Sequence, residues 1–116
     1  MYHKTVNSFP VIEDSDLKLP FFLRAVGTNE YQEHIIMPEG QFCHELCLCE
    51  EGEGILRVEG KEYHVKAGDV FFIRSQLPHE KFRVTNRWVT HFLLFGGFAT
   101  EALFEQFQWK NHEYFH

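Results

Sequence analysis

The feature that most constrains this chain is a series of short apolar runs separated by glycine turns, which begins at about Phe21. Gly52 and Gly54 bracket one turn, and Gly60 and Gly68 mark two more. Short runs with frequent turn residues are typical of an all-β sandwich or barrel, because each strand needs neighbours with which to pair. The expected strands cover residues 21–26, 31–36, 44–50, 54–59, 61–65, 69–73, 79–84 and 88–95.

After the two glycines at 96 and 97 the apolar residues recur at helical spacing, which predicts one short amphipathic helix. Its apolar residues are Ala99, Ala102, Leu103, Phe104 and Phe107. Thr100 is the predicted N-cap, since a threonine hydroxyl can accept a hydrogen bond from a free helical N–H. The tail beyond the helix carries Trp109, Tyr114 and Phe115, which we expect to find their covering surface in a longer chain or in a dimer.

The composition restricts the function as well as the fold. A chain of 116 residues supports one domain with one core, and 44% apolar residues are enough to fold it. We divide it into an N-terminal arm over 1–20, a barrel over 21–97, and a helix and tail over 98–116. The formal net charge of −6 excludes nucleic-acid binding by bulk electrostatics, so any DNA-binding part is expected elsewhere.

The cysteines and the apolar pattern bear on location. Cys43, Cys47 and Cys49 form a poor disulfide framework, because their number is odd and they lie close together, and this indicates a reducing cytoplasm. No apolar run approaches the roughly 20 residues that span a bilayer, and the first residues lack the apolar stretch of a secretory signal. We therefore expect a cytoplasmic protein with no membrane partner.

The same cysteines, together with His44, have two interpretations. A zinc or redox site is one, and core or pocket lining is the other. On a strand the cysteines would be strung along one face while His44 points away, whereas a tetrahedral site needs side chains that converge. Strand geometry therefore favours lining.

Two segments resemble the two cupin motifs. The segment from Gly68 to His79 keeps the spacing of the second motif, although the usual internal proline and glycine are replaced. The first motif keeps its acid, Glu45, and its glycine, Gly52, at the expected separation. The paired histidines that should precede Glu45 are missing. Depending on the gap length, their positions hold Glu39 and Gln41, or Pro38 and Gly40.

The order of these motifs resembles the sensor domain of AraC-type transcription regulators over about residues 31–97. The resemblance implies an all-β fold, a cupin-like double-stranded β-helix or jelly-roll barrel with a short C-terminal helix. It also implies that the barrel binds a small-molecule effector and that the domain forms a homodimer. A separate C-terminal helix-turn-helix domain, expected to lie outside this chain, would bind DNA.

Metal binding is the first chemistry to weigh, because cupins often hold a metal ion. A catalytic metal needs three or more converging protein ligands, and here Glu45 and His79 match ligand positions. Glu39 and Gln41 are weaker oxygen candidates. In the preferred interpretation Glu45 and His79 hydrogen-bond each other or a ligand, because the missing imidazoles are the strongest metal ligands. We expect no metal, no other cofactor and no catalytic residue, and the alternative function is a stand-alone metal-dependent cupin enzyme, a dioxygenase or isomerase.

Strand periodicity places the candidate pocket residues, because alternate side chains of a strand share a face. If Glu45 points inward then so does Cys47, and an inward His79 brings Lys81 with it. The resemblance implies ligand contacts at Lys81, Thr90 and Phe92. The complete candidate ligand-binding set is Glu45, Cys47, His79, Lys81, Trp88, Thr90 and Phe92.

Three members of this set have an alternative role. Lys81 could be a solvated strand residue, and if it is buried then Glu45 or an anionic ligand would neutralise it. Trp88 and Phe92 could be plain core residues.

A sensor also needs parts that move. The candidates are the arm over 1–20, which would close the barrel mouth, and the helix near 99–107, which would pair with another subunit. A sugar, a carboxylate or an aromatic compound would each suit such a wall.

Overall fold

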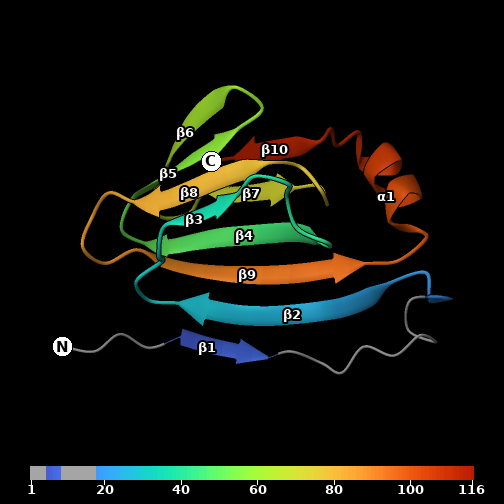
Figure 1. Ribbon diagram of the computed structural model, residues 1–116, viewed down its shortest axis with the longest axis horizontal. Coiled ribbons are helices and arrows are strands. Elements are labelled where there is room, and N and C mark those ends of the chain that lie inside the picture. The colour runs from blue at the N-terminus through green and yellow to red at the C-terminus, as the bar shows by residue number, and fades with distance from the viewer. Residues whose placement is uncertain (1–4, 9–17) are drawn as a thin grey trace.

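The computed structural model describes residues 5–8 and 18–116, and its strands form two antiparallel sheets (Figure 1). The strands are β1 Thr5–Ser8, β2 Phe22–Asn29, β3 Ile35–Met37, β4 His44–Glu51, β5 Gly54–Val58, β6 Lys61–Val65, β7 Val70–Ile73, β8 His79–Arg83, β9 Val89–Gly96 and β10 His112–Phe115, and the helix is α1 Thr100–Phe107. The larger sheet has the order β1-β2-β9-β4-β7-β10, and the smaller has the order β3-β8-β5-β6. The all-β architecture with a short helix near the C-terminus, predicted from the sequence, is confirmed.

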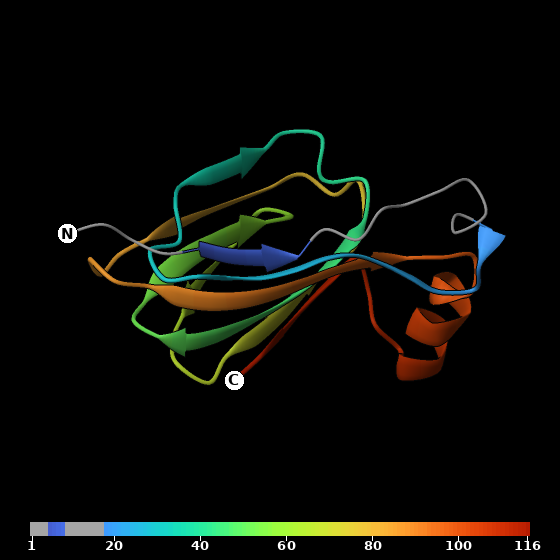
Figure 2. The ribbon, with the colours of Figure 1, turned by 90° about the horizontal axis from the view of Figure 1, so that it is seen from below.

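Side chains from both sheets meet in one core between the two layers. Figure 2 shows the two layers of strands in a view turned by 90° from Figure 1. Cys47 on β4 lies opposite Phe71 on β7 and Phe92 on β9, so β4 is central in the larger sheet. Leu56 on β5, in the smaller sheet, belongs to the same buried cluster as Cys47. The buried cluster comprises Cys47, Cys49, Leu56, Val58, Val65, Phe71, Ile73 and Trp88. Removing these side chains from water is the main force that holds the layers together.

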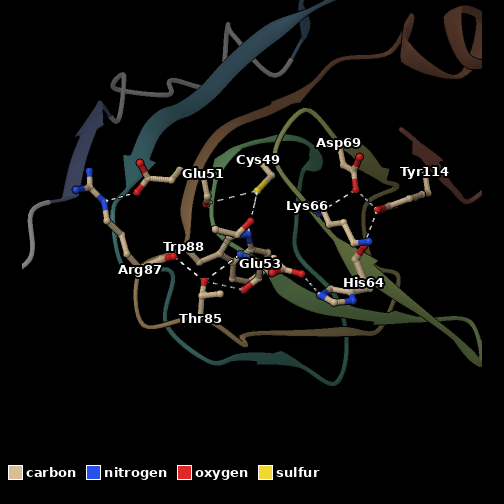
Figure 3. A network of polar contacts seen from close by, with 11 residues as sticks. Cys49, Glu51, Glu53, His64, Lys66, Asp69, Thr85, Arg87, Trp88 and Tyr114 are labelled. Carbon is tan, nitrogen blue, oxygen red and sulfur yellow. Dashed lines mark hydrogen bonds and ion pairs between the residues drawn. The ribbon is translucent and has the colours of Figure 1, made fainter.

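Polar contacts close the end of the barrel where the turns after β4, β6 and β8 gather (Figure 3). The indole N–H of Trp88 donates to Cys49 Sγ at 3.2 Å. Gly54 makes room for this indole, since a Cβ at that position would overlap the Trp88 ring. Thr85 Oγ1 accepts a hydrogen bond from the backbone N–H of Glu53 at 2.9 Å and ties two of the turns together. Trp88 therefore fills this end of the interior.

The C-terminal strand β10 pairs with β7 at the edge of the larger sheet. Tyr114 donates a hydrogen bond to the Asp69 carboxylate, and its ring stacks on Tyr63 with the centroids 4.6 Å apart. Trp109 packs on Phe72 at a centroid distance of 4.7 Å. The sequence predicts that the tail aromatics are covered in a longer chain or a dimer, but Trp109 and Tyr114 are half-buried against the chain's own barrel. Phe115, the third tail aromatic, is 41% exposed.

The strands differ from the prediction at three places. The predicted strand over 31–36 is only Ile35–Met37, because the chain crosses from the larger to the smaller sheet there, after an isolated bridge from Tyr31 to Trp88. Strands β1 and β10 are unpredicted edge strands, and β1 lies within the predicted arm. Residues 1–4 and 9–17 of that arm lie outside the described residues, so its closure over the barrel mouth stays a prediction.

Helix α1 packs against the outer face of the larger sheet, beyond the end of β9 (Figure 1). Phe104 is fully buried there, with its ring centroid 4.7 Å from those of His44 and Phe72. Phe104, from the helix face that the sequence assigns to a second subunit, thus packs on the chain's own barrel, while Phe107 of the same face is 52% exposed. The pairing of this face with a second subunit stays a prediction. The described residues hold no helix with the length and apolarity that crossing a bilayer requires.

The prediction that Thr100 caps this helix is wrong. The N-cap is Ala99, which makes no side-chain hydrogen bond to the helix. The Thr100 hydroxyl instead donates to the Gly97 carbonyl at 2.9 Å and lies 3.1 Å from His44 Nε2. The hydroxyl is used to fix the helix to the barrel rather than to satisfy a helical N–H.

We predict that Phe104→Ala lowers the free energy of unfolding by about 3–5 kcal/mol, because it leaves a cavity among buried rings. Phe107→Ala, on the same helix and half exposed, is the matched control and should cost about 1 kcal/mol or less. Urea unfolding followed by circular dichroism measures both. Equal losses for the two variants would show that the helix is not anchored through Phe104.

Candidate functional site

A buried ion pair joins the two sheets inside the barrel. Glu45 projects from β4 and Lys81 from β8, and Lys81 Nζ lies 2.6 Å from Glu45 Oε2. The two side chains are only 7% and 3% exposed for Lys81 and Glu45. Burial by itself lowers the pKa of the Lys81 ammonium, but the charge and hydrogen bond of Glu45 outweigh it and raise that pKa above its ordinary value. Lys81 is therefore inside the barrel, neutralised by Glu45.

The other carboxylate oxygen of Glu45 has its own neighbours. Gln41 Nε2 donates to Glu45 Oε1 at 2.9 Å, and His79 Nε2 lies 3.9 Å from the same oxygen. The His79 ring donates from Nδ1 to the Leu77 carbonyl at 2.9 Å, which leaves Nε2 as a bare acceptor. This buried Nε2 has no hydrogen-bond partner among the described residues. Burial lowers the pKa of His79, so the ring stays neutral near pH 7.

A pocket of about 300 Å³ opens beside this ion pair. It is lined by Asn29, Gln32, Ile35, Met37, Gln41, Glu45, Lys81, Phe92 and Leu94. Apolar and polar side chains are interleaved around it, because Ile35 is the cross-strand partner of Lys81 and Leu94 is the cross-strand partner of Glu45. Such a mixture is usual in small-molecule sites. The amide of Gln32 is fixed by Thr90, whose Oγ1 donates to Gln32 Oε1 at 2.8 Å.

Two larger hollows lie elsewhere. One, of about 500 Å³, is lined mainly by the turn between β5 and β6 and by the facing ends of β3 and β8. The other, of about 620 Å³, is lined by that same turn and by β10 with the segment before it. Most of their lining residues are exposed or half-buried. We place the site in the smaller pocket, because a buried charge pair faces a cavity there.

The structure brings together some of the predicted pocket residues and separates others. Glu45, Lys81 and Phe92 line the pocket. Thr90 lies behind it. His79 lies beside the ion pair but lines the hollow of about 500 Å³ instead. Cys47 and Trp88 pack instead in the core at the closed end. Burial raises the pKa of the Cys47 thiol to about 12, so this cysteine is inert packing.

Sequence reasoning missed other lining residues. Leu94 was placed on the correct face by its alternation with Phe92, but carried no chemical signal of its own. Gln41 stood out as a possible metal ligand, and it contacts Glu45 instead. Asn29 and Gln32 come from the end of β2 and the crossing that follows, where no strand periodicity reports a direction.

The residues do not fit a cupin metal. The Lys81 ammonium and the Gln41 amide nitrogen already lie at the two oxygens of Glu45, and a cation would have to displace them. Over the described ranges, no group of three or more His, Cys, Asp or Glu side chains could hold an ion. The cysteine row does not converge either, because His44 lies on the outer face under α1.

Comparison with known proteins gives a family and a fold. A sequence model described as the AraC-like ligand binding domain matches residues 25–116. No curated protein sequence matches the chain.

Three solved structures are similar to this chain in fold, and each has a sequence identity to it of less than 20%. YhaK from Escherichia coli is similar over 97% of this chain and 50% of its own, with 13% identity and a TM-score of 0.65. A cupin 2 conserved barrel domain protein from Salinispora arenicola covers 90% and 83%, with 15% identity and a TM-score of 0.56. An HTH_3 family transcriptional regulator from Vibrio cholerae covers 79% and 49%, with 17% identity and a TM-score of 0.56. At such identities the likeness concerns the fold, and the predicted cupin-like barrel is confirmed.

We predict that stability falls on mild acidification. Burial lowers the pKa of both His79 and His44, whereas a histidine in the unfolded chain has a pKa of about 6.5. Below about pH 6.5 the unfolded state therefore binds more protons, and the stability present above that value is lost as the pH falls toward the folded pKa values. The melting temperature, measured between about pH 8 and pH 5, should drop, and His79→Gln should reduce the slope.

His116→Gln, in the exposed tail, is the control for this series and should leave the slope unchanged. A slope in His79→Gln equal to that of the unaltered chain would show that His79 does not titrate on unfolding.

Proposed function

Because the chain belongs to the family of AraC-like ligand-binding domains, we propose that it is the effector-sensing part of an AraC-type transcription regulator. It is a ligand-binding sensor domain with a cupin fold. The observation that carries the proposal is the pocket beside the buried Glu45–Lys81 ion pair. A buried charge pair that faces a pocket is costly to keep unless something uses it, since well-packed apolar residues often serve stability as well or better.

In this role the barrel binds a small molecule, and a separate helix-turn-helix unit binds DNA. The net charge of −6 supports that division, because a DNA-binding surface needs clustered positive charge. The similarity to the Vibrio cholerae regulator covers 49% of that protein, so the same division into two parts would be possible there. A cytoplasmic location suits such a regulator, and the three buried free thiols agree with a reducing compartment.

We propose no catalytic role for the chain. The raised pKa of Lys81 keeps its amine protonated, and a protonated amine is not a nucleophile. Cys47 is held as a buried thiol by its raised pKa, and the Glu45–His79 pair lacks further metal ligands in the described part of the chain. The pocket therefore offers binding groups without an activated group.

Ligand binding is tested with a panel of small alcohols, amides, carboxylates, amines and monosaccharides. Amide shifts in two-dimensional NMR should identify at least one binder whose shifts centre on Glu45, Lys81 and Phe92. Phe92→Ala should weaken that binder roughly tenfold, because a buried aromatic wall contributes on the order of 1.5–3 kcal/mol. Leu48→Ala, on the outer face of β4, is the control and should bind as the unaltered chain does. Shifts that centre on another surface would contradict the proposal.

We also propose that the domain forms a homodimer, through an apolar patch at the end of the barrel beside α1. This end patch consists of Leu19, Phe21 and Phe98, which are 44%, 49% and 71% exposed. The backbone N–H of Phe98 donates to the Leu19 carbonyl at 3.4 Å, so the two segments that carry these residues lie side by side. Clustered exposed apolar residues are typical of an interaction surface.

The dimer is tested by light scattering during gel filtration. The unaltered chain should elute with the mass of a dimer, and Phe98→Ser should shift it toward monomer, because a polar residue removes apolar contact at the centre of the patch. Val84→Ser changes another exposed apolar residue, 56% exposed and away from the patch, and should remain dimeric. A monomer in the unaltered chain at high concentration would refute the proposal.

A further inference from the structure

We infer that the pocket selects an uncharged ligand with a hydroxyl or amide head on an apolar body, and that the balance of charge between Glu45 and Lys81 sets this selectivity. This inference rests on the proposed function and names the ligand class for the same pocket. It follows from the charge of the lining, from the hydrogen-bonding groups beside it and from the apolar side chains of the lining.

The charge of the lining is balanced within the protein. Among the described side chains that line the pocket, Glu45 and Lys81 are the charged ones, and they neutralise each other at 2.6 Å. His79 stands beside them as a neutral ring. A ligand carboxylate would compete with Glu45 for one ammonium and leave a net negative charge in the interior. A ligand ammonium would compete with Lys81 for Glu45 and leave a net positive one, and an unbalanced buried charge is strongly unfavourable.

The polar wall nevertheless needs hydrogen-bond partners. An ammonium has three N–H donors, and Lys81 uses one on Glu45, with Nζ also 5.5 Å from the Phe71 ring centroid. His79 Nε2 is a buried acceptor with no partner, 3.9 Å from Glu45 Oε1. A hydroxyl can both accept from Lys81 and donate toward Glu45, whereas a carboxylate can only accept. An uncharged head that donates therefore suits this wall.

The apolar part of the lining decides the rest of the ligand. Ile35, Met37, Phe92 and Leu94 present only carbon and thioether groups to the pocket. A ligand that is polar all round would leave hydroxyl groups without partners against these side chains, which is costly. An apolar body beyond the polar head removes these side chains from water instead.

The test uses matched head groups on one body. Phenylacetamide, phenylacetate and phenethylammonium, with their cyclohexyl counterparts, differ mainly in charge. By calorimetry or NMR titration at pH 7, the unaltered chain should bind the amide at least roughly tenfold tighter than either charged member, a difference of about 1.4 kcal/mol. Glu45→Gln leaves Lys81 unpaired and should shift the preference to the carboxylate. Lys81→Met leaves Glu45 unpaired and should shift it to the ammonium.

Controls keep the test decisive if a single variant does not fold. The double variant Glu45→Gln with Lys81→Met has no buried charge, which proteins usually tolerate, and should keep the preference for the amide. Glu80→Gln changes the residue directly before Lys81 on β8. Glu80 points to the opposite face of the strand, where it pairs with His34, so this variant should leave the preference unchanged.

The outcomes separate the two proposals. Tighter binding of a charged probe by the unaltered chain would overturn the selectivity inference and leave the sensor function in place. The same holds if the preference does not move in folded single variants. Failure of every probe to bind any folded variant would count against the pocket as a ligand site, and so against both.

Discussion

The ion pair between Glu45 and Lys81 is the interaction on which the interior of this barrel depends. It spans the two sheets, and its partners come from strands that are not paired with each other. Each charge is acceptable in the interior only because the other is present, since removing one partner leaves an uncompensated buried charge. The pair therefore holds β4 and β8 in one relative position. It also keeps the adjacent space polar, so that apolar side chains do not simply collapse into it.

The same pair explains how the chain keeps a cupin fold while departing from cupin metal chemistry. The acid and histidine at the matching motif positions, Glu45 and His79, are both inside the barrel and 3.9 Å apart. What has changed is their surroundings, because an ammonium from the next inward position of β8 now supplies the positive charge. A fixed side-chain cation cannot act as a Lewis acid with open coordination positions, but it can donate hydrogen bonds. The arrangement thus offers hydrogen-bond donors to a bound molecule.

Strand periodicity was enough to predict which way most side chains point, but not how far along the barrel they lie. Glu45 and Cys47 share a face of β4 as predicted, yet the first meets the pocket and the second is sealed in the core. The difference arises from the bulk of Trp88, which fills one end because Gly54 offers it room, and no two-residue period encodes that. Asn29 and Gln32 were missed for a related reason, because their positions depend on where the chain leaves one sheet for the other. The edge strands β1 and β10 form by pairing with β2 and β7, and such pairing cannot be predicted from a short apolar run alone.

The two faces of β4 connect the pocket to the helix over one peptide unit. Glu45 faces the ligand site, and its neighbour His44 faces outward, where its Nδ1 accepts from the Ser75 N–H at 2.9 Å and its Nε2 lies 3.1 Å from the Thr100 hydroxyl. Thr100 in turn bonds to the Gly97 carbonyl, next to Phe98 in the end patch. A ligand alters an assembly only if it favours one arrangement over another. In the structure, one strand therefore separates the pocket side of β4, at Glu45, from the contacts of His44 that seat α1.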